Sequence, residues 1–228
     1  MPGPFIDLSH PLDENVHVYP GDPAFCCKQV CGVPEGGFAV SELSLSSHLG
    51  THIDAPSHRV EGAAAIDVFP VDYFVRRAVI VDVSGKSEGS SVILSDLEPY
   101  ETRIQEGVAV LFHTGWDKYW SDKSGVYFKH PFIAREVADR LMELGVSVVG
   151  VDSMSPDSME EGADLPVHDV VLGAGRIIAE NLTNLGALHR IQEGDSSAVI
   201  MVSLAPLRLV GCDGSPVRAF AWTERSSS

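Results

Sequence analysis

Short apolar runs bounded by turn-forming residues recur along most of the chain. Residues 77–83 form one such run and are closed by Ser84-Gly85, and residues 107–113 form another. Runs of this length are typical of buried β-strands, and partial alternation over residues 40–46 is typical of a half-buried strand. The same criteria predict five further strands, over residues 5–9, 147–151, 176–180, 198–204 and 217–222.

Helical spacing is limited to a few segments. Over residues 133–144, apolar residues recur on one side, and Gly145 follows at the position typical of a helix C-terminus. Residues 166–172 predict a short helix with proline in its first turn. A helix or turn is expected to begin at Ser95, with Glu98 completing a weak capping box. Residues 181–188 predict a short helix or a loop.

Because strands outnumber helices, the pattern predicts an α/β or α+β fold with a dominant sheet. A length of 228 residues with 44% hydrophobic residues fits one large domain or two small ones. No repeat, low-complexity linker or compositional break divides the sequence. We therefore expect a single domain over residues 1–228.

Charge and cysteine usage exclude several classes of partner and compartment. The net charge of −16 argues against binding to nucleic acid or to an anionic membrane surface. No apolar run approaches the ~18 residues of a membrane-spanning helix, and the N-terminus lacks the features of a signal peptide. Three of the four cysteines are crowded at Cys26, Cys27 and Cys31 without a C-x-x-C pair, so a metal site there has little support. We expect reduced thiols in the cytosol.

Candidate metal ligands are concentrated in the segment His48-Leu-Gly-Thr-His52-Ile-Asp54-Ala-Pro-Ser-His58. Neutral imidazole together with carboxylate suits zinc, and also manganese or iron. No cysteine lies among these side chains, which argues against a structural zinc finger. The alternative, structural histidines beside a solvated aspartate, poorly explains four such groups in one short segment.

The local geometry of this segment restricts how it can close around an ion. On a helix, Asp54 would face away from His48 and His52. On a straight strand, the two histidines would lie roughly 13 Å apart, at about 3.3 Å per residue. A bend at Gly50 followed by an extended piece over residues 52–54 resolves this, and Pro56 keeps the exit extended. The motif is therefore predicted at a strand end that leads into a loop.

Three protein ligands leave positions open for water and substrate, as in catalytic metal sites. His58 is either a fourth ligand or a free base, and we favour the base, because an activated water must pass on its proton. Glu180 ends an apolar strand and needs a partner if it is buried, which a metal ion would provide. Taken alone, His168 could equally be a surface histidine and Glu180 a salt-bridged residue.

The order of these motifs resembles the metal-dependent cyclase superfamily, whose best-known branch is the bacterial-type kynurenine formamidases. The first motif is followed by Gly150-Val-Asp152-x-x-Ser155-x-Asp157, by His168 and by Glu180-Asn-Leu-x-Asn184-Leu. The resemblance runs from Phe5-Ile-Asp-Leu-Ser9 and Tyr19-Pro-Gly-Asp22 to the last strands. It implies a swivelling β/β/α fold with a dominant mixed sheet and few helices, and a homodimer or homotetramer.

The resemblance also implies roles for six residues. It implies one zinc held by His48, His52 and Asp54, and a second held by Asp54, His168 and Glu180, so that Asp54 bridges the two sites. One or two Zn²⁺ ions per chain are therefore expected, with Mn²⁺ as an alternative. The residue matching His58 carries catalytic duty. The implied activity is that of a cytoplasmic hydrolase of a small aryl formamide, with a place in tryptophan catabolism, or of a cyclic amide, since isatin hydrolases share the motif.

Two other functions are compatible with the same metal-binding motif. A cyclase or dehydratase would use the same metal to stabilise an enolate without a nucleophilic water, and a non-catalytic metal-binding relative would not need the intact His58. His113 stands where relatives often carry an arginine. Four aromatic residues outside the motifs are candidates for the substrate pocket, although each also fits plain core packing: Tyr19, Phe25, Phe38 and Trp116.

Overall fold

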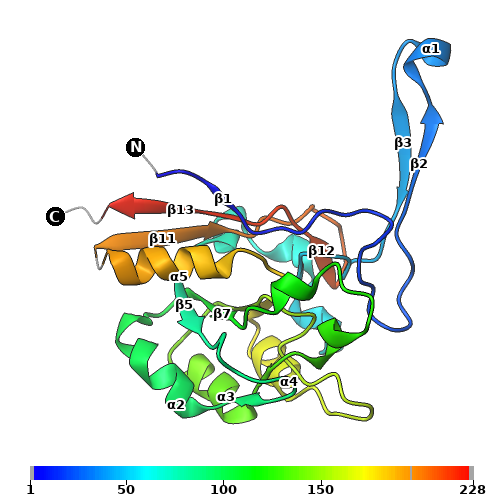
Figure 1. Ribbon diagram of the computed structural model, residues 1–228. Helices are drawn as coiled ribbons and strands as arrows, with labels where there is room; N and C mark the ends of the chain where they lie inside the picture. Colours follow the sequence, from blue (N-terminus) through cyan, green and yellow to red (C-terminus); the bar gives the residue numbers. More distant parts are fainter. Residues whose placement is uncertain (1–2, 196, 226–228) are drawn as a thin grey trace.

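A nine-stranded mixed sheet forms the centre of the protein in the computed structural model, which describes residues 3–195 and 197–225 (Figure 1). The apolar runs of the sequence supply its strands. In spatial order these are β1 (Ile6–Asp7), β13 (Phe220–Arg225), β11 (Ala198–Ser203), β5 (Val75–Asp82), β7 (Ala109–His113), β9 (Val148–Val151), β10 (Ile177–Glu180), β4 (His52–Asp54) and β12 (Gly214–Pro216).

The strand direction reverses between β10 and β4, and this reversal places residues of the candidate site side by side. Strands β5, β7, β9 and β10 are parallel, whereas β4 runs antiparallel to β10. The register places His52 opposite Glu180 and Asp54 opposite Ile178. On its other side β4 pairs antiparallel with β12, so β4 is held between two neighbours.

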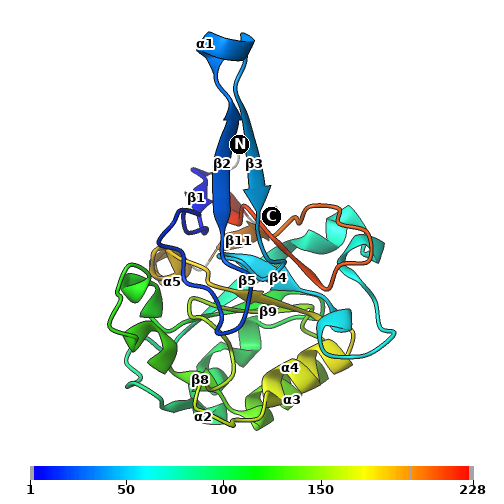
Figure 2. The ribbon, with the colours of Figure 1, turned by 90° about the vertical axis from the view of Figure 1, so that its right-hand side faces the viewer.

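Both faces of the parallel part are buried, which explains why its strands are apolar at successive positions. On β5, Ala78 and Ile80 belong to one core, and Val79 and Val81 belong to the other. Helix α5 (Leu185–Gly194) packs into the first core. Helices α3 (Arg135–Glu143) and α4 (Pro166–Gly173) pack into the second, on the opposite face (Figures 1 and 2).

The helix predicted over residues 133–144 is confirmed in its main part as α3. It starts later than expected because Ile133 belongs to β8 (Phe132–Ile133), which pairs with β6 (Ser91–Val92). Gly145 follows the helix with φ +75, the left-handed conformation predicted from its position.

One prediction about a helix start needs correction. Helix α2 (Leu94–Leu97) begins before Ser95, and the Asp96 carboxylate accepts the hydrogen bond from the Ile93 N–H, so the predicted capping box is wrong. Over residues 181–188, both predicted forms occur, because residues 181–184 are not helical and Asn181 and Asn184 adopt positive φ. The helix therefore begins only at Leu185, as α5.

A two-stranded arm projects from the body of the protein. The sequence pattern predicts only its second strand, over residues 40–46. Strands β2 (Cys26–Cys31) and β3 (Val40–Ser44) pair antiparallel and are joined through α1 (Val33–Gly36) (Figures 1 and 2). Apolar side chains on this arm are 43–61% exposed, namely those of Val30, Val33, Phe38, Val40 and Leu43. An isolated hairpin is marginally stable in water, so this amount of exposed apolar surface is unusual.

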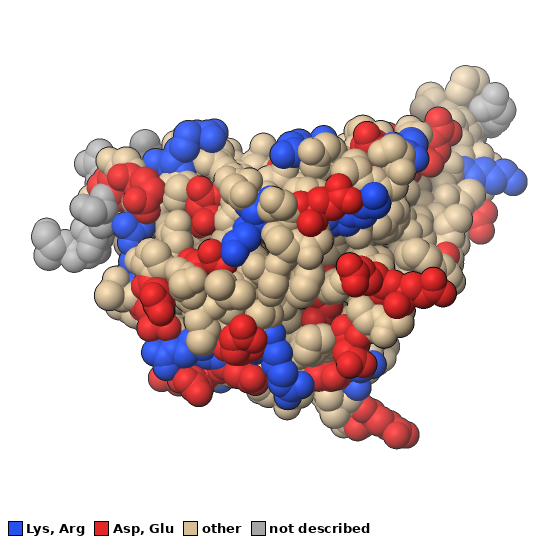
Figure 3. Space-filling view, turned by 60° about the horizontal axis from the view of Figure 1, so that its bottom comes forward, with Lys and Arg blue, Asp and Glu red and all other residues tan. Residues whose placement is uncertain are grey.

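The surface shown in Figure 3 carries interspersed acidic and basic side chains, and no broad basic patch forms on that face. Within the described ranges, no helix has the length and apolar character needed to cross a membrane. All four cysteines are unpaired.

Gly150 on β9 is closely packed by side chains of neighbouring segments. A Cβ at this position would lie 2.5 Å from Leu111 Cδ2 and 3.0 Å from Leu182 Cδ1. We expect Gly150→Ala to lower the free energy of unfolding by about 1–3 kcal/mol through overpacking, measured by urea denaturation. Gly173→Ala is the matched control, because a Cβ there meets open space within a helix. Equal stability of the two variants would contradict the expectation.

Candidate metal centre

The first motif folds as its residue types predict. Gly50 adopts φ +63, and a Cβ there would lie 2.3 Å from Leu12 Cδ2, so this position requires glycine. The bend returns the chain so that His48 Nδ1 lies 2.7 Å from Asp54 Oδ1. Residues 52–54 are extended as β4, and the predicted placement at a strand end is confirmed.

Strand pairing brings Glu180 to the same cluster. His52 Nε2 lies 3.3 Å from Asp54 Oδ1 and 3.3 Å from Glu180 Oε2. All three residues are buried, with at most 7% of each exposed. The sheet register therefore joins two segments that are far apart in the sequence.

The third histidine of the cluster, His168, lies on helix α4. His168 Nε2 lies 3.4 Å from Glu180 Oε1 and 3.8 Å from Asp54 Oδ2. The Asp157 carboxylate accepts hydrogen bonds from the Val167 and His168 N–H groups, which stabilises the first turn of the helix. The same carboxylate accepts a hydrogen bond from His168 Nδ1 at 2.6 Å.

The donor set fits a divalent metal on the observations of this structure. His48, His52 and Asp54 each offer one ligand atom within 4.8 Å of the others, and Asp54, His168 and Glu180 do the same. Three buried atoms in this cluster make no hydrogen bond: His52 Nε2, Asp54 Oδ2 and Glu180 Oε1. Buried polar atoms without partners are costly, and a cation among them would satisfy all three. No such group among the described residues includes a cysteine.

Electrostatics of the cluster favour positive charge at its centre. Burial opposes ionisation of Asp54, but His52 and His48 outweigh it and hold the pKa of Asp54 well below its usual range. Burial lowers the pKa of His168, but the hydrogen bond to Asp157 and the nearby carboxylate of Glu180 outweigh burial and raise that pKa to about 10. The pKa of His52 is likewise raised, because Asp54 overcomes the effect of burial. Protons thus occupy the ring nitrogens that a metal would take.

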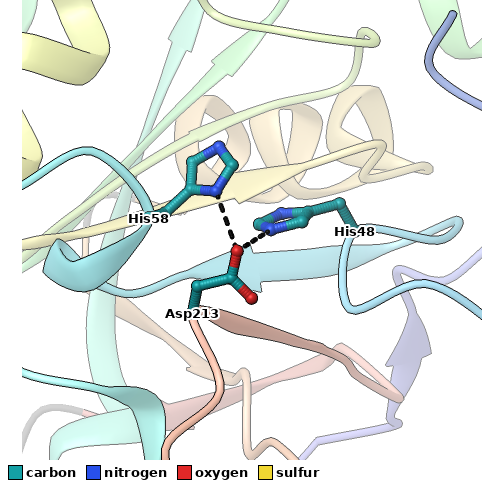
Figure 4. A group of neighbouring side chains, drawn as sticks. All are labelled: His48, His58 and Asp213. Carbon is teal, nitrogen blue, oxygen red and sulfur yellow. Dashed lines mark hydrogen bonds and ion pairs between the residues drawn. The ribbon is translucent and has the colours of Figure 1, made fainter. Parts of the chain in front are cut away.

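His58 lies beside the cluster rather than inside it. It ends the short 3₁₀ turn Pro56–His58, and its ring centroid is 4.0 Å from that of His48. Its Nδ1 lies 3.2 Å from Asp213 Oδ2 (Figure 4). This position is compatible with both roles considered for His58, and its choice as a base stays a prediction.

A cavity of about 320 Å³ opens over the cluster. That volume lies at the lower end of the range for small-molecule sites. It is lined by the three candidate ligands His48, His52 and His168 with Glu180, by His58 and Arg59, and by Tyr19, Asp22, Met154, Ser155 and Leu165.

The four aromatic candidates for the substrate pocket lie in different places. Tyr19 lines the cavity. Trp116 is buried in a small core, where its indole N–H donates to the Val126 carbonyl, and Phe25 packs against the same core. Phe38 is 61% exposed on the projecting arm. Of the four, only Tyr19 lines this cavity among the described residues, and a role in substrate binding stays a prediction for each.

Two carboxylates near the cluster were not assigned from the sequence. Asp157 stands in a quoted motif, but its bond to His168 depends on how α4 packs. Asp213 lies 155 residues from His58 in the sequence and contacts it only through the fold. Its single sequence signal is the turn-like Asp213-Gly-Ser-Pro.

Metal binding at pH 7 is expected to release protons. His168 and His52 have raised pKa values in the metal-free protein, so both hold protons at pH 7 that a metal must displace. We expect release of about two protons per chain, and a metal affinity that rises with pH. Calorimetry in buffers of different ionisation enthalpy measures this number. Binding without proton release would contradict the assignment of these histidines as ligands.

Comparison with known proteins agrees with this geometry. The model of the Cyclase family ("Putative cyclase") matches residues 6–158. The kynurenine formamidase of Geobacillus thermodenitrificans is 32% identical over 222 residues, covering 96% of this chain and 97% of that protein.

Solved structures give the same result. Isatin hydrolase A from Ralstonia solanacearum superposes with a TM-score of 0.83 at 25% identity, over 97% of this chain and 92% of that one. A structure described as a predicted metal-dependent hydrolase from Bacillus stearothermophilus has a TM-score of 0.72 at 27% identity, over 96% and 98% of the two chains. The predicted swivelling β/β/α fold is confirmed by these neighbours, and the chain belongs to the cyclase family.

Proposed function

We propose that this protein is a metal-dependent hydrolase that cleaves an amide-type C–N bond in a small aryl formamide or cyclic amide. The observation that carries the proposal is the carboxylate of Asp54, shared between two sets of buried ligands beneath an open cavity. The names of the relatives, kynurenine formamidase and isatin hydrolase, agree on this bond type. Carbonyl polarity and a leaving nitrogen are common to both substrates.

His48, His52, Asp54, His168 and Glu180 would hold the metal. A bound divalent ion would lower the pKa of a coordinated water toward about 7 and polarise the carbonyl of the substrate. The donor set of imidazole and carboxylate suits Zn²⁺ and also Mn²⁺. We propose zinc, one or two ions per chain, with manganese as the alternative.

His58 is proposed to move the proton. Its Nδ1 is hydrogen-bonded to Asp213, which leaves Nε2 for the reaction. In the forward step Nε2 takes a proton from the attacking water while the O–C bond forms. It then gives that proton to the leaving nitrogen as the C–N bond breaks, so that the proton balance closes. The immediate products are formic acid and an aryl amine, or a ring-opened carboxylic acid with its free amine, and the acid then loses its proton to solvent as formate or the ring-opened carboxylate.

The cavity walls position the substrate. Met154 and Leu165 supply apolar surface, and Tyr19 adds an aromatic face at the mouth, where it is 42% exposed. Such a lining suits a flat aromatic ring whose polar end reaches the cluster.

We propose that residues 1–228 act as one domain in the cytosol, in the breakdown of a tryptophan-derived metabolite.

We further propose a homodimer or homotetramer. Support comes from the projecting arm of β2 and β3, whose apolar side chains are exposed on a chain of net charge −16. Self-association would cover these side chains and stabilise a hairpin that is marginal alone.

The function is tested by formate release. We expect the zinc-loaded protein to release formate from N-formylkynurenine, with about two metals per chain by elemental analysis. His58→Ala should lower kcat by about 10²–10⁴-fold with metal retained, because it removes proton transfer only. Asp54→Asn should lose metal and activity together.

The control for His58 is His189→Ala, since His189 is partly buried and does not line the cavity. Turnover of isatin without formate release from N-formylkynurenine would select the cyclic amide. Bound metal with turnover of neither substrate would contradict hydrolysis and favour cyclase or dehydratase chemistry.

The role of the arm in self-association is tested by substituting charged residues on its surface. The double variant Val30→Glu/Leu43→Glu places two carboxylates on exposed apolar positions of the arm. We expect it to weaken self-association at least about tenfold, measured by sedimentation equilibrium, because buried unpaired charges are costly. Val210→Glu, at a position 84% exposed and off the arm, is the control. A monomeric wild-type protein would refute the oligomer.

A further inference from the structure

Asp213 is anchored directly beside the end of β4. Its carbonyl accepts a hydrogen bond from the Ala55 N–H at 2.8 Å. The next residue, Gly214, pairs with Asp54 in the sheet. The backbone therefore holds the Asp213 side chain at a set place next to the metal cluster, although the side chain remains 43% exposed.

One oxygen of Asp213 serves two histidines. Oδ2 lies 3.0 Å from His48 Nε2 and 3.2 Å from His58 Nδ1, and the side chains converge from the two ends of the segment 48–58 and from the residue before β12 (Figure 4). Oδ1 accepts a hydrogen bond from Ser47 Oγ at 2.9 Å, which orients the carboxylate. Because a carboxylate only accepts, both ring nitrogens that face it must carry the proton.

The contact with His48 completes a pattern among the candidate ligands. His52 has its Nδ1 bonded to the Gly50 carbonyl at 2.8 Å, and His168 has its Nδ1 bonded to Asp157 at 2.6 Å. In each of the three histidines one ring nitrogen is held by an oxygen, and the other faces the cluster. For His48 the held nitrogen is Nε2, and Nδ1 faces Asp54, so a bound metal would displace the proton on Nδ1 and leave the proton on Nε2. Such outer hydrogen bonds set the tautomer and orientation of metal-binding histidines.

The contact between Asp213 and His58 affects proton transfer rather than metal binding. With Nδ1 held by Asp213, the neutral ring carries its proton there and presents a bare Nε2. A bare ring nitrogen is what a group that accepts a proton needs. A carboxylate on the far ring nitrogen also restricts rotation of the imidazole.

The local backbone makes room for this arrangement. A Cβ on residue 214 would lie 2.7 Å from the Ile53 carbonyl oxygen and 3.0 Å from His48 Cε1. Gly214 therefore allows β12 to approach β4 while the His48 ring lies against it. Without this close approach the Asp213 carboxylate could not reach both rings.

We propose that Asp213 is a positioning residue that holds His48 in the tautomer for metal binding and His58 in the tautomer for proton transfer. The part that concerns His58 rests on the proposed function, whereas the part that concerns His48 does not. One side chain then affects two separable quantities, metal affinity and kcat.

Ring tautomers in the wild-type protein provide the first test. Long-range ¹H–¹⁵N spectra of the zinc-loaded protein, with labelled histidine and at a pH where the rings are neutral, identify the protonated nitrogen. We expect Nε2–H for His48 and Nδ1–H for His58. A proton on Nε2 of His58, or on Nδ1 of His48, overturns the proposal without any need for a variant.

Asp213→Asn provides the second test, because it keeps the size of the side chain and removes the carboxylate. Chelator competition is expected to show zinc affinity about 10–100-fold weaker, and kcat at saturating zinc about 10–100-fold lower, with KM changed less than about threefold. The matched control is Asp82→Asn. Asp82 also bonds a histidine, since His113 Nδ1 lies 3.0 Å from its Oδ1, but neither residue lines the cavity.

The outcomes separate the inference from the proposed function. Zinc affinity and kcat that both match the Asp82→Asn control overturn the inference. A change in KM alone overturns it as well, since that indicates substrate contact rather than positioning. Weaker zinc binding together with the expected tautomers supports the His48 part, even if the wild-type protein releases no formate and the proposed function fails.

Discussion

The buried carboxylate of Asp54 is the constraint on which the rest of the site depends. It is 1% exposed and lies at the centre of a sheet junction, where an unpaired charge would be strongly destabilising. The fold resolves this by surrounding it with three imidazole rings, while Glu180 adds a second negative charge. Two carboxylates with oxygens within 4.8 Å of each other repel, and protonated imidazole rings or a metal ion would compensate their charge.

Sheet topology explains why the cluster forms at this place. Glu180 ends β10, the last parallel strand, and the carboxyl ends of parallel strands are where ligands bind in such sheets. The antiparallel β4 then starts beside that end, so its first residue lies opposite Glu180. Four of the five candidate ligands thus lie on strands or a helix, whereas His48 lies in the turn before β4 and His58 on the short 3₁₀ turn after it, where the cavity opens.

A set of outer oxygens decides what each histidine can do. The Gly50 carbonyl, Asp157 and Asp213 each take one ring nitrogen and leave the other for chemistry. Orientation of this kind requires that each oxygen be placed by its own backbone contacts. Asp157 is placed by the first turn of α4, and Asp213 by its pairing with the end of β4. The chemistry therefore depends on packing outside the ligand motif.

The sequence by itself determined the strand-rich class, the bend at Gly50 and the ligand-bearing strand His52–Asp54, because these depend on local backbone preferences and on spacing within a few residues. It indicated Glu180 through the cost of a carboxylate ending an apolar strand. Only the tertiary structure decided that Asp213 contacts His48 and His58, and that Phe38 and Trp116 do not line the cavity. These contacts join residues with no periodic relation along the chain, and they arise from sheet register and helix packing, which short-range pattern does not encode.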